Sequence, residues 1–366
     1  MATQPRWPLL ALFFGLSLPS HAAAQPAAPF PEAAATITHL AMQYAHASEP
    51  GWASVYTGLV QAMPDDVRFT VAVESGEERE RLDALLQVLE VRRPEVFEVD
   101  VPITPWTRDR ALYLGGRAPV SVLTPFPDGI TDDYAGDLAA AAALAERMNR
   151  VHASASVSFE GGDIVCMTRL ALLGHGSIAQ NSDARGPLAA RRRFEQLLQR
   201  KVAVLGRAGA PHEHIDMFLT PLGPKLVALG CPELGAALLR EGYAPLPTFD
   251  EWTEEAQRSA QPRYAGILRE LEALGLEVVR VPILHGAEDS VLTWNNCLVE
   301  RRDGVVHVYM PTYRAPGFDE AAGRVFEGAG CRVHPIDASA IVGDGGAVRC
   351  LTNVVQWRPD LGRRRS

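Results

Sequence analysis

Cys350 is the residue whose surroundings most suggest chemistry in this sequence of 366 residues. It follows Gly345 and Gly346, where the missing side chains let the backbone approach a ligand closely. A cysteine becomes a nucleophile when a base or a positive charge lies near its thiol. The common alternative is a cysteine buried in a strand, so a nucleophilic role depends on what else the chain brings to Cys350.

The other four cysteines have no comparable setting. Apolar, strand-like surroundings favour core positions for Cys166 and Cys297. Cys231 and Cys331 each follow a glycine, and the sequence is compatible with either a disulfide between them or core positions for both. Five cysteines are few for a disulfide scaffold, and the odd count leaves at least one thiol unpaired in an oxidising compartment.

Four polar residues are candidate partners of the Cys350 thiol. His214 and Asp216 lie two apart in a strand-like stretch, so their side chains point to one face. The histidine could protonate a leaving group while the aspartate binds a cation; a solvated His–Asp pair is the alternative. Asp109 and Glu160 add carboxylates from separate parts of the chain.

This gathering of carboxylates favours a guanidinium ligand. Two carboxylates can hold the planar cation through paired, charge-assisted hydrogen bonds. Metal binding is the competing use of such a cluster, but these residues lack the close spacings of a zinc site. We therefore expect no metal and no cofactor.

The elements that must position these residues follow a repeating pattern. An amphipathic helix followed by a strand is predicted five times, at 81–91 and 96–103, 138–150 and 153–159, 187–200 and 202–205, 264–275 and 276–283, and 318–330 and 331–336. Each unit ends in an unusual polar peptide, at 106–109, 160–163, 212–216, 294–296 and 345–350. Such units suggest a radial α/β arrangement with the five peptides at its centre; an ordinary α/β sheet is the alternative.

The terminal segments and the composition of the chain predict its location, its domains and the charge of its partner. Residues 1–24 have the pattern of a cleavable signal peptide, which predicts a secreted or periplasmic protein with no membrane span. Residues 25–35 are expected to be a flexible lead-in, 36–366 a single catalytic domain, and 243–262 an inserted surface loop. A net charge of −9 disfavours nucleic acid and suits a cationic partner.

The ordered motifs resemble one superfamily. They are Trp-x-Arg-Asp (106–109), Glu-Gly-Gly (160–162), His-x-Asp (214–216), Asn after an aromatic residue (294–296) and Gly-Gly-x-x-x-Cys (345–350). This order is similar to that of the guanidine-modifying enzymes, and within them to the agmatine deiminase and Porphyromonas-type peptidylarginine deiminase family. The resemblance implies a five-bladed α/β propeller, the pentein fold, of degenerate ββαβ repeats.

The resemblance also implies roles for residues of the motifs. Asp109 and Asp216 would hold the guanidinium, His214 would be general acid and then base, and Cys350 would attack the central carbon. Glu160 would orient the histidine or the substrate. Water would then release a ureido product, after ammonia has left, from a covalent thiouronium intermediate.

Further residues of the motifs are candidates for shaping the pocket. Asn296 would help to form it, and Trp106 could stack on the cation, as could Trp294, with core packing as the alternative. An arginine directly before the nucleophile, here Arg349, looks more like the free-arginine deiminases. Its charge could lower the pKa of the thiol, or its side chain could point to solvent. Arg110-Ala111 replaces a frequent Gly-Pro.

These departures leave the substrate open among peptidylarginine, agmatine and free arginine. Export argues for arginine in peptides or scavenged derivatives, because agmatine deiminases that supply putrescine usually work in the cytoplasm. An amidinotransferase, which passes the same intermediate to an amine, and an inactive guanidinium-binding protein are the alternative functions. Oligomeric state is left open.

Overall fold

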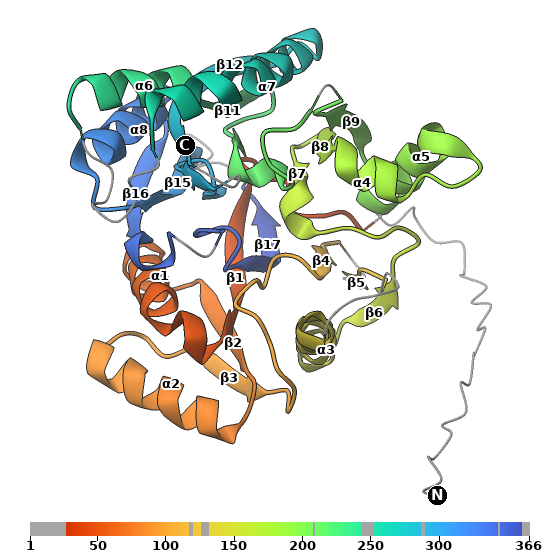
Figure 1. Cartoon of the computed structure of the whole chain (residues 1–366). Helices are drawn as coiled ribbons and strands as arrows, with labels where there is room; N and C mark the ends of the chain where they lie inside the picture. The colour runs from red at the N-terminus through yellow and green to blue at the C-terminus, as the bar shows by residue number, and fades with distance from the viewer. Residues whose placement is uncertain are drawn as a thin grey trace, which may run out of the picture.

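The structure is a computed structural model that describes residues 27–116, 120–125, 132–207, 209–243, 252–286, 290–342 and 345–360. In these residues the chain forms five small β-sheets, with helices on the outside of the molecule (Figure 1). The predicted signal peptide lies outside the described residues. No helix in the described part of the chain is long and apolar enough to cross a membrane.

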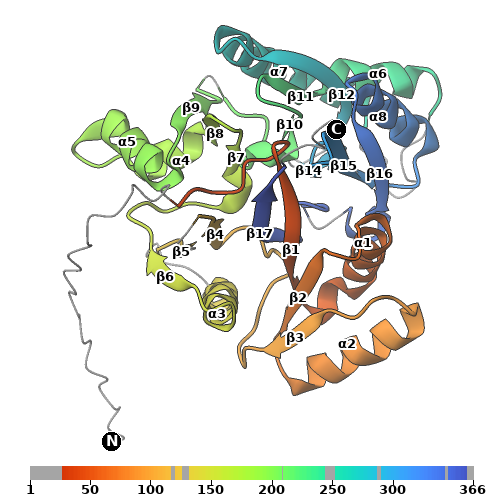
Figure 2. The same ribbon diagram turned by 180° about the vertical axis from the view of Figure 1, so that it is seen from behind.

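The first sheet joins the two ends of the described chain. Its strands are, in spatial order, β17 (Asn353–Pro359), β1 (Ala35–Tyr44), β2 (Arg68–Val73) and β3 (Glu95–Glu98). β17 runs antiparallel to β1, whereas β1, β2 and β3 are parallel and are connected by α1 (Glu49–Ala62) and α2 (Gly76–Leu89). Figure 2, the view from behind, shows β1 and β17 side by side near the centre, as Figure 1 does.

The other four sheets repeat one arrangement, in which two antiparallel strands are followed by a helical connection to a strand parallel to the second. β13 adds an antiparallel edge to the fourth sheet. The elements are β4 (Ala111–Leu114), β5 (Val120–Leu123), α3 (Asp132–Arg147) and β6 (Val151–Ser154); β7 (Ile164–Cys166), β8 (Leu170–Gly174), α4 (His175–Gln180), α5 (Gly186–Leu198) and β9 (Lys201–Leu205); β10 (Leu219–Pro221), β11 (Leu226–Cys231), α6 (Pro232–Arg240), α7 (Glu254–Ala273), β12 (Glu277–His285) and β13 (Val291–Thr293); and β14 (Leu298–Arg302), β15 (Val305–Thr312), α8 (Pro316–Gly328) and β16 (Arg332–Asp337).

The helices pack on the sheets through narrow apolar stripes. In α7 the buried side chains Ala260, Tyr264, Ile267 and Leu271 recur every three or four residues, which places them on one face. The helix begins after Thr253, whose side-chain hydroxyl accepts a hydrogen bond from the N–H of Ala256 (3.1 Å). The opposite face of the helix is left to charged residues.

All five predicted helix–strand pairs overlap observed ones: α2 with β3, α3 with β6, α5 with β9, α7 with β12 and α8 with β16. The periodicity did not predict a sixth pair, α1 with β2. Trp52, Val55, Tyr56 and Leu59 have the spacing of one buried helix face, but the opposite face of α1 is weakly polar, because Glu49 is the one charged residue of the helix.

Two predictions about irregular segments need correction. Residues 254–262 are not a surface loop but the start of α7, where Glu254 and Glu255 favour the positive end of the helix dipole; residues 244–251 lie outside the described residues. Residues 27–34 are not a flexible lead-in. Ala28 pairs with Gly115, and Glu32 is buried, so this segment packs against the body of the protein.

Candidate active site

Five polar segments that lie far apart in the sequence meet at one place. Four of them follow the last parallel strand of a sheet, β3, β6, β9 or β16, and the fifth, residues 294–296, follows β13. Backbone hydrogen bonds join neighbouring segments: they run from Arg108 N–H to Cys350 O (3.3 Å), from Gly161 N–H to Asp109 O (3.2 Å) and from Arg349 N–H to Asn296 O (3.1 Å). The fold thus brings together all five peptides that the sequence marks as unusual.

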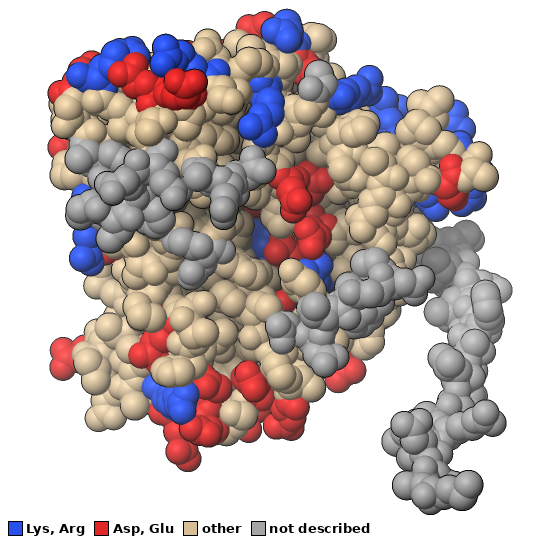
Figure 3. Space-filling view, in the orientation of Figure 1, with Lys and Arg blue, Asp and Glu red and all other residues tan. Residues whose placement is uncertain are grey.

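A cavity of about 180 Å³ lies among these segments. Predicted site residues on its wall are Trp106, Asp109, Glu160, His214 and Cys350. The wall also contains residues that the motifs did not assign to the site, namely Arg110, Tyr134, His212, Glu213 and Gly345. Figure 3 shows acidic side chains gathered near the centre of the molecule in this view.

Asp216, Asn296 and Arg349 do not line the cavity but lie behind its wall. Trp294 is farther away, in the core: it stacks on Phe318, and its indole N–H donates to Asp319 (2.8 Å). Core packing is therefore the correct interpretation of Trp294. Trp106, by contrast, is a wall residue of the cavity.

The Cys350 thiol is held by Asn296. The side-chain N–H of Asn296 donates to Cys350 Sγ (3.1 Å), and Asn296 Oδ1 accepts the backbone N–H of Cys350 (3.2 Å). Cys350 is 4% exposed. Burial raises the pKa of the thiol, the charge of Asp216 raises it further, and a hydrogen bond with His214 acts against both.

His214 connects the thiol to a carboxylate and an arginine. Its Nε2 lies 2.7 Å from Glu160 Oε2, and Arg110 donates to the other oxygen of Glu160 (2.9 Å). Burial alone would lower the pKa of His214, but hydrogen bonds with Cys350 and Glu160 and the charge of Asp109 raise it well above its ordinary value. The hydrogen bond from His214 lowers the pKa of Glu160 to about 2. The site thus favours the protonated imidazole of His214 and the ionised carboxylate of Glu160.

The two remaining carboxylates are buried and only partly paired. Asp109 Oδ1 accepts a long hydrogen bond from the Gly162 N–H (3.4 Å), and burial raises the pKa of Asp109. Asp216 is fully buried; its Oδ2 accepts from Arg349 Nε (2.9 Å), while its Oδ1 has no hydrogen-bond partner among the described residues. Burial raises the pKa of Asp216 to about 7. Such a carboxyl group has acceptor capacity left for a ligand.

Arg349 neither points to solvent nor lines the cavity. Its guanidinium is 2% exposed and is paired with two carboxylates, Asp216 and Glu32. Glu32 takes both terminal nitrogens, with Nη2 to Oε1 at 2.9 Å, and Arg108 approaches the same oxygen at 3.9 Å. Two carboxylates around one guanidinium keep Arg349 charged. Arg349 therefore supports Asp216 from behind.

Glu32 is the functional residue that sequence reasoning missed. It lies 317 positions before Arg349 in a segment whose composition suggested flexibility. No local pattern marks it. The one available signal was chemical: a buried arginine next to a nucleophile needs a counter-charge, and the sequence does not say which carboxylate supplies it.

Two glycines of the motifs are required by close approach. A side chain at Gly346 would place its Cβ 2.5 Å from the Trp106 ring, and one at Gly162 would place it 2.5 Å from His214 Nδ1. Both distances are shorter than non-bonded atoms allow. These positions therefore let the tryptophan and the histidine reach the cavity wall.

All five cysteines are buried and none forms a disulfide, so Cys231 and Cys331 are unpaired. Burial raises the pKa of both thiols to about 11, so neither is poised for nucleophilic chemistry. Among the described residues, no three His, Cys, Asp or Glu side chains form a group suited to a metal ion.

The chain resembles known proteins in structure, whereas comparison by sequence finds no match. No family model and no curated protein matches the chain. Agmatine deiminase from C. jejuni superposes with a TM-score of 0.65 at 14% identity, covering 92% of this chain and 96% of that one. A Cys-to-Ser variant of that enzyme with substrate bound gives 0.66 at 14% identity, with 94% and 100% covered.

Agmatine deiminase of Enterococcus faecalis gives a TM-score of 0.65 at 16% identity, covering 90% of this chain and 95% of that one. At identities this low the structural agreement shows a shared fold alone, and that agreement spans nearly the whole length of each protein. The mixed α/β arrangement of five small sheets in this chain is therefore the fold of the agmatine deiminases, consistent with the pentein fold that the motifs imply.

Proposed function

We propose that this chain is a guanidine deiminase, which hydrolyses a substituted guanidinium to a ureido product and ammonia through a covalent intermediate on Cys350. One observation carries the proposal: the thiol of Cys350, the imidazole of His214 and the carboxylates of Asp109 and Glu160 share the wall of one small cavity. The fold shared with agmatine deiminases supports it.

Capture of the cation begins with Asp109 on the wall. The unpartnered Oδ1 of Asp216 is the second acceptor, reached as the guanidinium carbon approaches Cys350. Each carboxylate accepts charge-assisted hydrogen bonds from the planar cation, and the low dielectric of the buried site strengthens them. Ionisation of both carboxyl groups is thus favoured by the ligand itself.

Binding of the cation also activates the thiol. In the empty site, burial and the charges of Asp216 and Asp109 raise the pKa of Cys350 and oppose the thiolate. A bound guanidinium neutralises these two carboxylates and adds a positive charge beside the sulfur. The protonated His214 adds another, so the thiol gives its proton to solvent and the thiolate forms when substrate is present.

The reaction then proceeds in two halves. The thiolate attacks the guanidinium carbon, forming a C–S bond; His214 gives its proton to one nitrogen, and the C–N bond to that nitrogen breaks to release ammonia. The neutral His214 next takes a proton from water as the water oxygen attacks the same carbon. The C–S bond breaks with its electron pair returning to sulfur, the hydroxyl on the carbon gives its proton to the released ammonia, and the neutral urea product and the thiolate separate.

The cavity favours a guanidine without a free carboxylate nearby. Its wall contains Asp109, Glu160 and Glu213, and its arginine, Arg110, already pairs with Glu160. A carboxylate on the substrate would meet like charges there. We therefore propose agmatine, or arginine within a peptide, as the substrate class rather than free arginine.

Two further features belong to the same proposal. The five sheets would form a five-bladed α/β propeller around the cavity; the repeated strand arrangement and the pairing of β17 with β1 support this. Residues 1–24 would direct export and be removed. Sequencing the amino terminus of the protein recovered from secreted or periplasmic fractions tests that step.

The deciding experiment measures ammonia release by the chain lacking residues 1–24. Substrates are agmatine, free arginine and peptides with internal or C-terminal arginine. Cys350→Ala should abolish release, whereas Cys231→Ala, a matched change at another buried cysteine, should keep it. Release that survives Cys350→Ala would overturn the mechanism.

The product distinguishes the alternative functions. If an added amine becomes a new guanidino compound and no ammonia appears, the protein is an amidinotransferase. If guanidines bind with neither product, the protein is a binding protein. Faster turnover of free arginine than of agmatine or peptides would overturn the proposed substrate class alone.

A further inference from the structure

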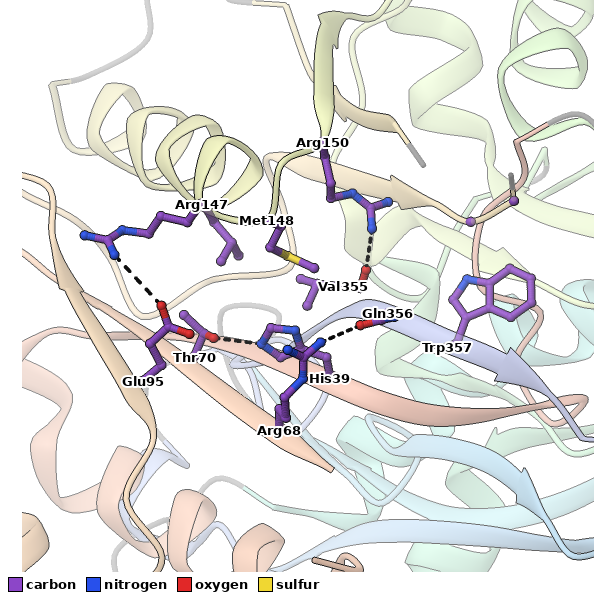
Figure 4. A pocket seen from close by; sticks show the side chains of 13 residues that line it. His39, Arg68, Thr70, Glu95, Arg147, Met148, Arg150, Val355, Gln356 and Trp357 are labelled. Carbon is purple, nitrogen blue, oxygen red and sulfur yellow. Dashed lines mark hydrogen bonds and ion pairs between the residues drawn. The ribbon is translucent and has the colours of Figure 1, made fainter. Parts of the chain in front are cut away.

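A second cavity, of about 450 Å³, lies at the other end of the strands that lead to the catalytic segments. Arg68 and Glu95 are the first residues of β2 and β3, and Arg150 directly precedes β6. The catalytic segments follow the last residues of β3 and β6. This cavity therefore lies away from Cys350, between the first sheet and the sheet of β6 (Figure 4).

The lining of this cavity is positively charged, although the whole chain carries a net charge of −9. Arg68, Arg147 and Arg150 contribute guanidinium groups, and Glu95, 3.9 Å from Arg147, is the acidic residue of the lining. Arg68 donates to the neutral side chain of Gln356 (2.7 Å). Figure 4 shows Arg68 beside His39, Arg150 at the start of β6, and Arg147 of α3 extending away from them toward Glu95.

Arg150 is a buried cation without a carboxylate partner. It is 8% exposed, and its terminal nitrogens donate to backbone carbonyls, those of Leu114 (2.7 Å) and Val355 (2.9 Å) among them. Within the described residues its Nε has no hydrogen-bond partner, and no Asp or Glu pairs with it. A buried charge of this kind is costly unless an ion of opposite sign completes it.

His39 is a second incompletely paired group in the same cavity. It is 3% exposed; its Nε2 lies 2.7 Å from Thr70 Oγ1, while its Nδ1 has no hydrogen-bond partner among the described residues. Burial and the charges of Arg68 and Arg150 lower the pKa of His39 to about 4. An imidazole with an unused nitrogen beside two guanidinium groups is suited to donate a hydrogen bond to an anion.

The remaining wall is largely apolar. Leu144, Met148 and Val355 line it, and Trp357 lies apart from Arg147 and Glu95 in Figure 4. The indole nitrogen of Trp357 is buried and has no partner in the described part of the chain. The cavity volume falls within the range of small-molecule sites, which is roughly 300 to 1,000 Å³.

We propose that this cavity binds a phosphate monoester, with its phosphate on Arg68, Arg150 and His39 and its organic group toward Trp357. Guanidinium groups match phosphate geometry through paired hydrogen bonds, and two of them near the His39 imidazole suit a doubly charged anion. The organic group replaces water along the apolar wall. This site is independent of the proposed reaction at Cys350.

The test is calorimetric titration of the chain lacking residues 1–24 with phenyl phosphate, at constant ionic strength set with chloride. We expect saturable binding to one site, weaker binding of inorganic phosphate, and a shift of the His39 imidazole signal in NMR spectra. Arg68→Gln should weaken binding about tenfold or more, the loss expected for one charge-assisted contact.

Matched variants separate this site from adventitious binding. Arg79→Gln, at an exposed arginine of α2 that pairs with Glu98, should bind as the unaltered protein does. Arg150→Lys tests the buried cation without removing its charge and should also weaken binding. No saturable binding at millimolar concentrations, or equal affinity in Arg68→Gln, would overturn the proposal. Inorganic phosphate as tight as phenyl phosphate would exclude the ester and its apolar subsite.

Discussion

The two cavities lie at opposite ends of strands that they share, and they carry opposite charge. At the catalytic end, Asp109, Asp216 and Glu160 surround a thiol, whereas Arg68, Arg147 and Arg150 surround the cavity at the other end. The buried apolar residues inside these strands do not choose a ligand. The side chains at their boundaries do, so one framework can serve a cation at one end and an anion at the other.

The two ends also differ in how their buried charges are balanced. At the catalytic end the buried cations His214 and Arg349 have carboxylate partners in the protein: His214 pairs with Glu160, and Arg349 with Glu32 and Asp216. At the other end Arg150 is held by carbonyl oxygens. A site whose charges are already paired within the protein can hold catalytic groups in fixed positions before substrate arrives. A cation without a carboxylate partner instead receives its counter-charge from the ligand.

Loss of the negative charge at Asp216 tests the catalytic end most severely. Asp216→Asn should lower kcat/KM by about 100-fold or more, because a buried charge-assisted contact to the substrate is lost and Arg349 loses one of its two partners. Steady-state kinetics with agmatine measure it. Asp183→Asn, at an exposed aspartate that pairs with Arg185, is the matched control. An unchanged kcat/KM would show that Asp109 alone holds the cation.

Removal of Glu32 tests whether the ion pair between Glu32 and Arg349 positions Asp216 for substrate binding. Glu32→Gln should destabilise the protein by about 3 kcal/mol, measured by denaturant unfolding, because Arg349 is left buried with one carboxylate. Asp216 would then carry the pairing alone, so its pKa should fall and the acid limb of the kcat/KM profile should move to lower pH.

A purely structural role for Glu32 would lower stability and leave that limb in place. Glu32→Asp, which keeps the charge, should restore part of both properties. Loss of activity with an unmoved acid limb would contradict the positioning role of the Glu32–Arg349 pair.

The pH dependence of substrate binding tests the role of Asp216 as a carboxylate ligand separately from the covalent steps at Cys350. Burial raises the pKa of Asp216 to about 7, so the group binds a proton below that pH and must release it to accept the guanidinium. In the Cys350→Ser variant, affinity for agmatine should therefore fall as pH drops below about 7, by up to about tenfold per pH unit, and level off above it. Calorimetric titration at constant ionic strength measures this; an affinity independent of pH between about 5 and 8 would contradict it.

The smallest expected effect on turnover is at the opposite end. Arg68→Gln should leave kcat/KM for agmatine unchanged, since Arg68 contacts Gln356 and not the catalytic cavity. The same assay with and without phenyl phosphate shows whether the two ends act independently. A large loss of activity in this variant would mean that the comparison of two separate sites is wrong.

Much of the site could be predicted from the sequence because its residues occur in short segments with unusual composition. Cys350, His214 and Asp109 all line or face one cavity, and the helix–strand alternation predicted the elements that precede them. The fate of Trp294 and Arg349 could not be predicted. Both follow a motif locally, but their surroundings are made by Phe318 and Glu32, far away in the chain.

The sequence by itself determined the chemistry available: a thiol, an imidazole and several carboxylates, each placed after a strand, and glycines where backbone and ring must come close. These are local properties of residue type and spacing. Only the tertiary structure decided which carboxylates pair with which cations, that residues 27–34 complete the catalytic end, and that Arg150 is left without an acid partner in the described part of the chain. Such pairings depend on the distance between residues that the fold alone brings together, and on the burial that makes each unpaired charge costly.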